Sequence, residues 1–142
     1  MLVVKRDGTE ETLNFEKIHR VLNWAAKGLE DISISQVELH SRLLFFDGIS
    51  TDTIHQTLIN SAADLISEEH SDYQYMAARL AVFHLRKKVY GQFEPPTLLS
   101  HVEKMIDLDK YDPSLLELYN NEEISRMDSF VNHQRWILLM LV

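Results

Sequence analysis

Residues 3–18 follow a pattern of apolar and polar positions that predicts a β-hairpin leading directly into a helix. The stretch opens with two β-branched residues, and Asp7-Gly8 is a strong signal for a tight type I′ turn between strands. A second strand returns through Thr12-Leu13, after which Asn14 is a residue type that caps helix N-termini. The pattern therefore predicts two short strands close to the start of a first helix.

The first predicted helix is amphipathic, because apolar residues recur every three or four positions and polar residues occupy the opposite side. Gly28 is placed to end this helix, since glycine readily adopts the left-handed conformation that follows many last turns. The apolar positions are Phe15, Ile18, Leu22, Ala25 and Leu29.

The second predicted helix begins at a capping box, for which Ser33 with Gln36 and Ser35 with Glu38 are alternatives. We expect it to end at Asp47-Gly48. Its apolar positions, together with two phenylalanines assigned to the core, are Val37, Leu39, Leu43, Leu44, Phe45 and Phe46.

Two further helices complete the first part of the chain. The third can be capped by the side-chain oxygens of residues 50–52, which leaves free backbone amides at Thr51. The fourth starts near Asp72 and is apolar nearly all round, so we expect it to be the most buried helix. The cations at 86–88 suit its last turn, where positive charge interacts favourably with the helix dipole.

Pro95-Pro96 cannot continue a helix and predicts a boundary in the chain. Beyond it, residues 97–107 read as a helix, and Asp112-Pro113 and Asn121 each open another. The expected divisions are a first domain at 1–92, a helical extension at 93–135 and an apolar tail at 136–142.

Composition limits the classes of function. The chain has 142 residues, 45% of them hydrophobic, which is enough for one core, and a net charge of -8 that argues against a nucleic-acid partner. The absence of cysteine excludes disulfides, thiolate metal sites and cysteine nucleophiles or radicals. No apolar run reaches the ~20 residues of a membrane span, and no signal peptide is recognisable. We therefore expect a cytoplasmic protein without membrane or nucleic-acid partners.

Three cations, Lys5, Arg6 and Lys17, are expected to lie close together where the hairpin meets the first helix. A few focused cations can bind a small anion such as a nucleotide phosphate even in an acidic protein. The alternative is a solvated edge strand with ordinary surface cations. Spacing alone leaves both interpretations open.

The search for catalytic groups is negative. The seven histidines lack metal-ligand spacing, and the adjacent glutamate pairs point in different directions, which is poor geometry for acid and base catalysis. There is neither a glycine-rich phosphate loop nor a nucleophile elbow. We therefore predict no catalytic residue and no metal ligand in this chain.

Several motifs occur together along the chain: Val3-Val4-Lys5-Arg6-Asp7-Gly8, Asn14 through Lys17-Ile18, Asp47-Gly48-Ile49-Ser50-Thr51-Asp52 with His55, Arg86-Lys87-Lys88, and Tyr90-Gly91-Gln92-Phe93-Glu94-Pro95. In this combination they resemble the ATP-cone, the allosteric nucleotide-binding module of ribonucleotide reductases. The likeness continues through Lys110-Tyr111-Asp112 and His133-Gln134-Arg135 and covers residues 2–135. The chain is therefore similar to the N-terminus of the large subunit of an aerobic class Ia enzyme.

The resemblance implies a mainly α fold. A four-helix bundle carries a small β-hairpin sheet as a lid and is followed by a short helical extension. ATP or dATP, with Mg²⁺, is expected beneath the lid, with Lys5 and Arg6 on the first strand among its ligands. The positions that match the family's nucleotide site are Lys5, Arg6, Glu11, Asn14, Lys17, Ile18, Thr51, His55 and Lys87.

These residue types suit a nucleotide. Lysine and arginine form charge-assisted bonds with phosphate oxygens, and free amides at Thr51 suit an anion. Glu11 and Asn14 offer acceptors and a donor for adenine or ribose edges, and Ile18 offers an apolar wall.

The resemblance also implies an allosteric mechanism. ATP as activator and dATP as inhibitor compete for the cone, and dATP favours an inactive ring of large and small subunits. The implied partners are a second large subunit and the small radical-generating subunit. The parent enzyme reduces ribonucleotides to deoxyribonucleotides for DNA synthesis.

Two departures from the family bear on activity. The catalytic barrel and its cysteines are missing, and residues 136–142 do not follow the family pattern. We therefore expect a truncated, non-catalytic chain, although the parent family is enzymatic. The alternative is an interaction or structural fragment with a silent cone, and the presence of Lys5 and Lys87 argues against it.

Overall fold

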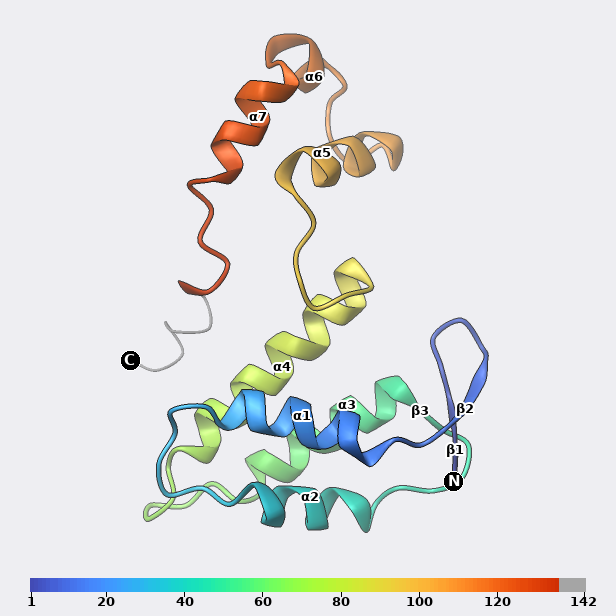
Figure 1. Cartoon of the computed structure of the whole chain (residues 1–142), viewed down its shortest axis with the longest axis vertical. Coiled ribbons are helices and arrows are strands. Elements are labelled where there is room, and N and C mark those ends of the chain that lie inside the picture. Colours follow the sequence, from blue (N-terminus) through green and yellow to red (C-terminus); the bar gives the residue numbers. More distant parts are fainter. Residues whose placement is uncertain (136–142) are drawn as a thin grey trace. The chain divides into compact units, whose positions relative to one another are not determined.

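A computed structural model describes residues 1–135, so the prediction for the tail at 136–142 lies outside the described residues. The chain forms two compact units, Met1–Leu85 and a second that starts at Arg86 (Figure 1). The elements in chain order are β1 (Leu2–Val4), β2 (Glu10–Thr12), α1 (Phe15–Ala26), α2 (Ile34–Arg42), β3 (Ile49–Ser50), α3 (Thr51–Ala63), α4 (Tyr73–Tyr90), α5 (Leu98–Asp107), α6 (Ser114–Leu118) and α7 (Asn121–Asp128). The predicted mainly α fold, with four helices, a small sheet and a helical extension, is confirmed.

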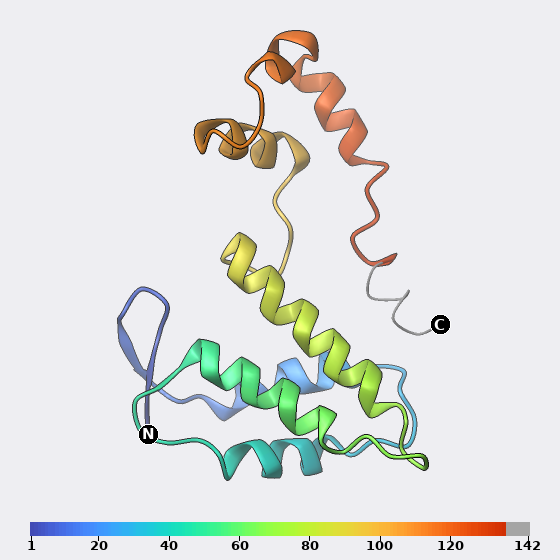
Figure 2. The ribbon, with the colours of Figure 1, turned by 180° about the vertical axis from the view of Figure 1, so that it is seen from behind.

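The sheet has three strands in the order β2-β1-β3. β1 is antiparallel to β2 and parallel to β3, so that Val3 lies opposite both Glu11 and Ile49. Val3 and Ile49 are buried and join the sheet to the helical core. Figures 1 and 2 show the hairpin at the end of the helices where α1 begins and where the segment after α2 enters β3.

The predicted type I′ turn is wrong. That turn needs positive φ at both central residues, but within residues 1–135 only Asp31 and Asp109 among the non-glycine residues have positive φ. Gly8 N donates to Lys5 O at 3.0 Å and has a φ of 82°, while Lys5 N donates to Thr9 O at 2.8 Å. The loop is therefore one residue longer than predicted, with the left-handed glycine at its end.

The Asp7 carboxylate explains the longer turn. Asp7 Oδ1 accepts from Thr9 N at 2.9 Å and from Thr9 Oγ1 at 2.6 Å, a local arrangement that aspartate favours in turns. The hydrogen bond from the Thr9 hydroxyl, followed by that from the Thr9 amide, holds the pKa of Asp7 below its usual value. β1 ends at Val4, so Lys5 and Arg6 lie in the loop rather than on the predicted strand.

α1 agrees with its predicted ends. Asn14 Oδ1 accepts from Glu16 N at 2.9 Å and Lys17 N at 3.3 Å, and Gly28 follows the last turn with a φ of 72°. Of the five apolar positions predicted for this helix, the middle three are buried, and the first and last are not. The buried residues of this helix are Ile18, Leu22 and Ala25.

α2 is shorter than predicted. Ser33 is its cap. Ser33 N donates to the hydroxyl of Tyr73 at 2.9 Å, so Tyr73 provides the acceptor that the glutamine side chain would provide in a capping box. The helix ends at Arg42 because the chain then turns, with Phe45 N donating to Arg42 O at 3.2 Å. This turn changes which of the later apolar positions face the core. Val37 and Phe45 are buried, whereas Leu39, Leu43, Leu44 and Phe46 are exposed.

α4, which the sequence predicts to be the most buried helix, is buried in its first half and exposed toward its end. Its first half contributes Tyr73, Met76 and Leu80 to the core. In its second half, the side chains of Leu85 and Val89 are 57% and 52% exposed. Because both halves of the helix are rich in apolar residues, the sequence alone does not show which half packs in the core and which half is exposed.

In the described part of the second unit, three helices with well-defined starts follow the end of α4. Thr97 caps α5, and Asp112 Oδ1 accepts from Ser114 N at 2.9 Å where α6 begins. α7 begins at Asn121, as predicted, and the residue before it is the cap, because Asn120 and Glu123 form a complete capping box. α5 packs against α7, and each contributes one buried apolar side chain, Val102 and Ile124.

We expect Asn120→Ala to weaken the start of α7 by about 1 kcal/mol, because the helix loses the side-chain acceptor for Glu123 N. Amide hydrogen exchange in α7 should accelerate about fivefold as a result. Asn121→Ala is the matched control, since this neighbouring residue lies inside the helix. Equal acceleration in both variants would contradict the capping role.

Candidate functional site

The hairpin and α1 bring three charged side chains together. Glu11 Oε2 lies 2.8 Å from Lys5 Nζ, and Glu11 Oε1 lies 3.2 Å from Lys17 Nζ. The hairpin explains this geometry, because Val3 and Glu11 lie opposite each other and Lys5, directly after the strand, stays beside the returning chain through its bond from N to Thr9 O at 2.8 Å. We call Lys5, Glu11 and Lys17 the lysine–glutamate cluster.

The cluster is electrostatically coupled. Hydrogen bonds from Lys5 and then Lys17 hold the pKa of Glu11 below its usual value, and the bond to Glu11 raises the pKa of Lys5. A carboxylate with a lowered pKa stabilises the fold above its ordinary pKa, and this stabilisation is lost as the pH falls through the folded value. The structure therefore places Lys5 and Lys17 close together, as predicted, and both form ion pairs with Glu11.

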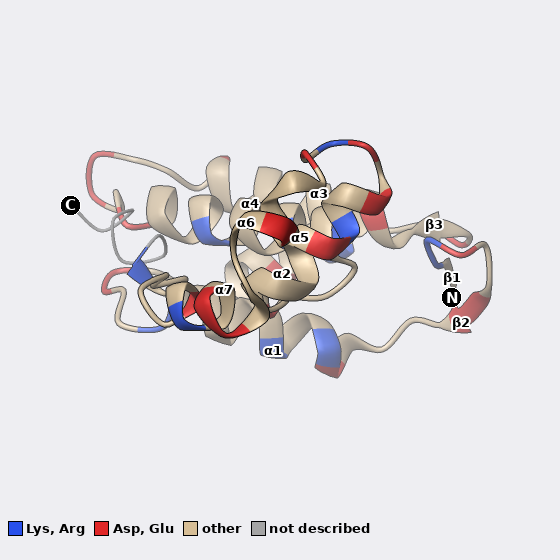
Figure 3. Cartoon of the chain, turned by 90° about the horizontal axis from the view of Figure 1, so that it is seen from above, with Lys and Arg blue, Asp and Glu red and all other residues tan. Residues whose placement is uncertain are grey.

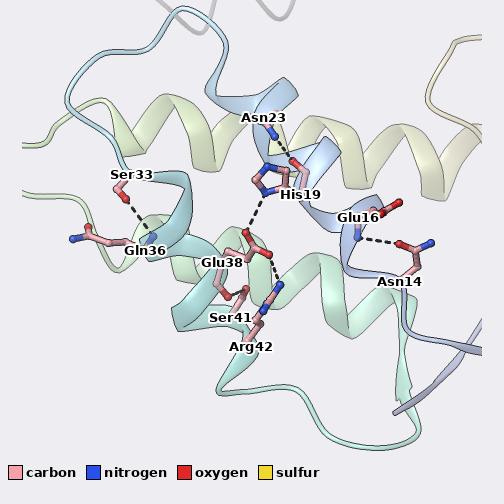
Figure 4. Close-up of polar contacts among 9 residues, drawn as sticks. All are labelled: Asn14, Glu16, His19, Asn23, Ser33, Gln36, Glu38, Ser41 and Arg42. Atoms are coloured by element: carbon pink, nitrogen blue, oxygen red, sulfur yellow. Dashed lines mark hydrogen bonds and ion pairs between the residues drawn. The ribbon is translucent and has the colours of Figure 1, made fainter.

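Three other candidates lie near the cluster in sequence but have different surroundings. Arg6 is exposed in the hairpin loop. The side-chain oxygen of Asn14 is engaged in capping α1, as Figure 4 shows for its bond with Glu16. Ile18 is only 6% exposed and belongs to the core, so its side chain lies inside the first unit.

Thr51 and His55 lie on α3. Ser50 caps this helix, its Oγ accepting from Thr53 N at 3.0 Å, and Thr51 is the first helical residue. The His55 ring lies 5.4 Å from the ring of Phe83 and 5.5 Å from that of His84, measured between centroids. These contacts fix the orientation of the His55 imidazole on the side of α3 that faces α4.

Sequence reasoning missed the neighbours of His55. Phe83 also lies 5.8 Å from the ring of Trp24, and His84 Nε2 is 3.5 Å from Asp52 Oδ1. The four rings come from three helices, so no spacing within one helix reveals them. The available signal was Trp24, a large aromatic residue among the small residues near the end of α1.

Lys87 lies in the last turn of α4, in the part of the helix that belongs to the second unit. Its neighbour Arg86 donates from Nη2 to His133 O at 2.7 Å, and its guanidinium lies 5.1 Å from the ring centroid of Phe93. Arg86 therefore ties the end of α4 to the segment after α7.

A separate open groove of about 500 Å³ lies between α1 and α2, lined by Phe15, Glu16, His19, Arg20, Glu38 and Arg42. Glu38 joins its two sides, because its carboxylate contacts His19 Nδ1 at 3.1 Å and Arg42 Nη2 at 2.6 Å (Figure 4). The Arg42 guanidinium also lies 4.1 Å from the centre of the Phe15 ring. This groove contains none of the predicted site residues.

Charges of both signs meet at the hairpin, where Figure 3 shows acidic β2 beside basic residues. Within residues 1–135, no three histidine, aspartate or glutamate side chains are grouped closely enough to hold a metal ion. None of the helices in this same range combines the length and the apolar character needed to cross a membrane.

The amino-acid sequence can be compared with those of known proteins. The profile of the ATP cone domain family matches residues 1–88, and the chain belongs to this family. The chain is 62% identical over 135 residues to the ribonucleoside-diphosphate reductase 1 subunit alpha of Escherichia coli K12, and 64% identical to the corresponding subunit alpha of Buchnera aphidicola from Schizaphis graminum. The subunit alpha of Enterobacteria phage T4 is 42% identical.

These matches cover 94 or 95% of this chain but only 18% of each relative. The chain thus spans less than one fifth of the length of the curated relatives that it matches.

Proposed function

We propose that this chain is the allosteric ATP/dATP-binding region of a ribonucleoside-diphosphate reductase alpha subunit. The observation that supports this most directly is the convergence of the Lys5 and Lys17 side chains on Glu11 of the hairpin, in a chain of the ATP cone domain family. The proposed ligands of the nucleotide are Lys5, Arg6, Glu11, Asn14, Lys17, Ile18, Thr51, His55 and Lys87.

The residues present fit a nucleotide polyphosphate. Lys5 and Lys17 offer two ammonium groups within contact distance of one carboxylate, so the oxygens of a phosphate chain can replace that carboxylate. Mg²⁺ is proposed to arrive bound to the phosphates, where it neutralises part of their charge. Ile18 contributes by shaping the core beneath the hairpin, because its side chain is buried.

The domain limits are part of the proposal. We place the regulatory domain at 1–92 and the helical extension at 93–135. The left-handed Gly91, with a φ of 73°, ends α4 directly before this boundary. Two prolines follow at 95–96 and prevent the helix from resuming.

Discrimination between ATP and dATP depends on one ribose hydroxyl. A buried partner of that hydroxyl left unpaired costs about 1 to 3 kcal/mol, which is enough to separate the two effectors. Regulation further requires that each effector binds two quaternary states with different affinities. We propose that these states involve a second alpha subunit and the small radical-generating subunit of an enzyme that reduces ribonucleotides.

The test is isothermal titration of the chain with ATP and with dATP in magnesium buffer. We expect Lys5→Ala and Lys87→Ala each to weaken binding about tenfold, because each variant loses a charge-assisted bond to phosphate. Lys88→Ala is the matched control, since Lys88 is the exposed neighbour of Lys87 on the same helix. A folded protein that releases no heat with either nucleotide would instead indicate a silent cone with an interaction role.

A further inference from the structure

Glu11 occupies the two ammonium groups that the proposed function assigns to phosphate. Its carboxylate uses one oxygen for Lys5 and the other for Lys17, at 2.8 and 3.2 Å. A phosphate group makes the same kind of contact with ammonium groups, through oxygens of the same charge. The ligand and the Glu11 side chain therefore require the same positions around the two lysines.

We propose that Glu11 is a built-in competitor, an autoinhibitory counter-ion that a polyphosphate must displace from Lys5 and Lys17 in order to bind. The inference rests on the proposed function and adds a second role for Glu11: its carboxylate first pairs with the two lysines, and only after its displacement by phosphate can it act as a ligand of the base or ribose. When a polyphosphate displaces Glu11, the lysines exchange one ionic contact for another. The binding free energy of the polyphosphate is therefore less favourable than its own contacts with the lysines would give.

The surroundings of Glu11 single it out among nearby carboxylates. Glu10 lies opposite Val4, so strand alternation places it on the other face of the hairpin. Asp7 is bonded to Thr9. Within the hairpin and the first turn of α1, as the structure describes them, Glu11 is the carboxylate that pairs with both Lys5 and Lys17.

The two ion pairs of Glu11 are partly exposed to solvent. The side chain of Glu11 is 33% exposed, less than those of Lys5 and Lys17, at 41 and 58%. Solvent therefore screens the two ion pairs incompletely. The lowered pKa of Glu11 agrees with this, because it shows that the two lysines favour the charged carboxylate.

Glu11→Gln is the variant of choice, since glutamine keeps the size of the side chain and removes its charge. The probe is inorganic triphosphate, which has no base or sugar and so isolates the competition at the two lysines. We expect Glu11→Gln to bind triphosphate about fivefold more tightly than the natural chain, in line with two partly exposed ion pairs. Glu10→Gln, the control with the same charge change, should leave the affinity unaltered.

Titration calorimetry at low and at high sodium chloride gives the decisive comparison. The gain from Glu11→Gln should shrink at high salt, because salt screens the ion pairs that the variant removes. An unchanged or weaker triphosphate affinity in Glu11→Gln overturns the proposal, as does an equal gain in Glu10→Gln or a gain that salt does not affect.

ATP titrations separate this inference from the proposed function. If Lys5→Ala weakens ATP binding while Glu11→Gln fails to tighten triphosphate binding, the nucleotide site stands and the competitor role is overturned. If the natural chain binds triphosphate with the expected Glu11→Gln gain but does not bind ATP, the competitor role stands and the proposed nucleotide function fails. If neither ligand binds, both are overturned.

Discussion

Arg79→Met is expected to lower the free energy of unfolding of the first unit by about 3 kcal/mol. Arg79 is only 4% exposed, although arginine is almost never fully buried without partners. Its Nη1 donates to Ala25 O at 2.9 Å and to Lys27 O at 2.7 Å. Methionine fills much of the same volume, so the loss should report the hydrogen bonds rather than a cavity.

The two carbonyls explain why the effect is large. They lie at the C-terminus of α1, where helical carbonyls lack intrahelical partners and the helix dipole favours a cation. Burial lowers the pKa of Arg79, and the charge of Asp72 opposes that change, so the guanidinium stays protonated. Without Arg79, the buried carbonyl of Ala25 and the partly buried carbonyl of Lys27 both lose the guanidinium as a donor.

Urea denaturation followed by circular dichroism measures this loss. Lys88→Met is the control, because it makes a comparable replacement at an exposed position of the same helix and should change stability by less than about 0.5 kcal/mol. Arg79→Lys should recover only part of the stability, since one ammonium lacks the planar fork of guanidinium. A loss below about 1 kcal/mol in Arg79→Met would show that the carbonyls find other partners.

Local sequence rules predicted the starts of the helices well. Asn14 and Ser33 each accept a backbone hydrogen bond at the helix start where the sequence placed a cap. These signals depend on the chemistry of one residue and its next few neighbours, so they can be read without knowledge of the fold. The same is true of the left-handed Gly28 after α1.

Features that depend on tertiary contacts were missed or mistaken. β3 has only two residues, so it carries no alternating pattern, and it exists because Val3 lies beside Ile49. In the candidate site, the sequence placed Lys5 and Lys17 close together but gave Glu11 a role toward adenine or ribose. The bridging position of Glu11 depends on the register of the hairpin, which an incorrect turn type would have shifted.

Leu22→Ala should lower the free energy of unfolding by about 3 kcal/mol, within the range measured when a buried leucine is truncated. The Leu22 side chain is fully buried on α1 and belongs to the core of the first unit. The neighbouring helices close over it, so the removed methyl groups leave a cavity that the packed core fills only in part. Thermal and urea unfolding of the whole chain measure the loss.

Leu43→Ala is the matched control, because the substitution is chemically identical and the sequence pattern assigned both leucines to apolar helix faces. Leu43 is 76% exposed, since α2 ends at Arg42 and the chain turns away before the next helical position. Its truncation should therefore change stability by no more than about 0.5 kcal/mol. Similar losses for Leu22→Ala and Leu43→Ala would mean that α2 continues as the sequence pattern predicts. A large loss for Leu22→Ala alone would locate the stabilising burial on α1.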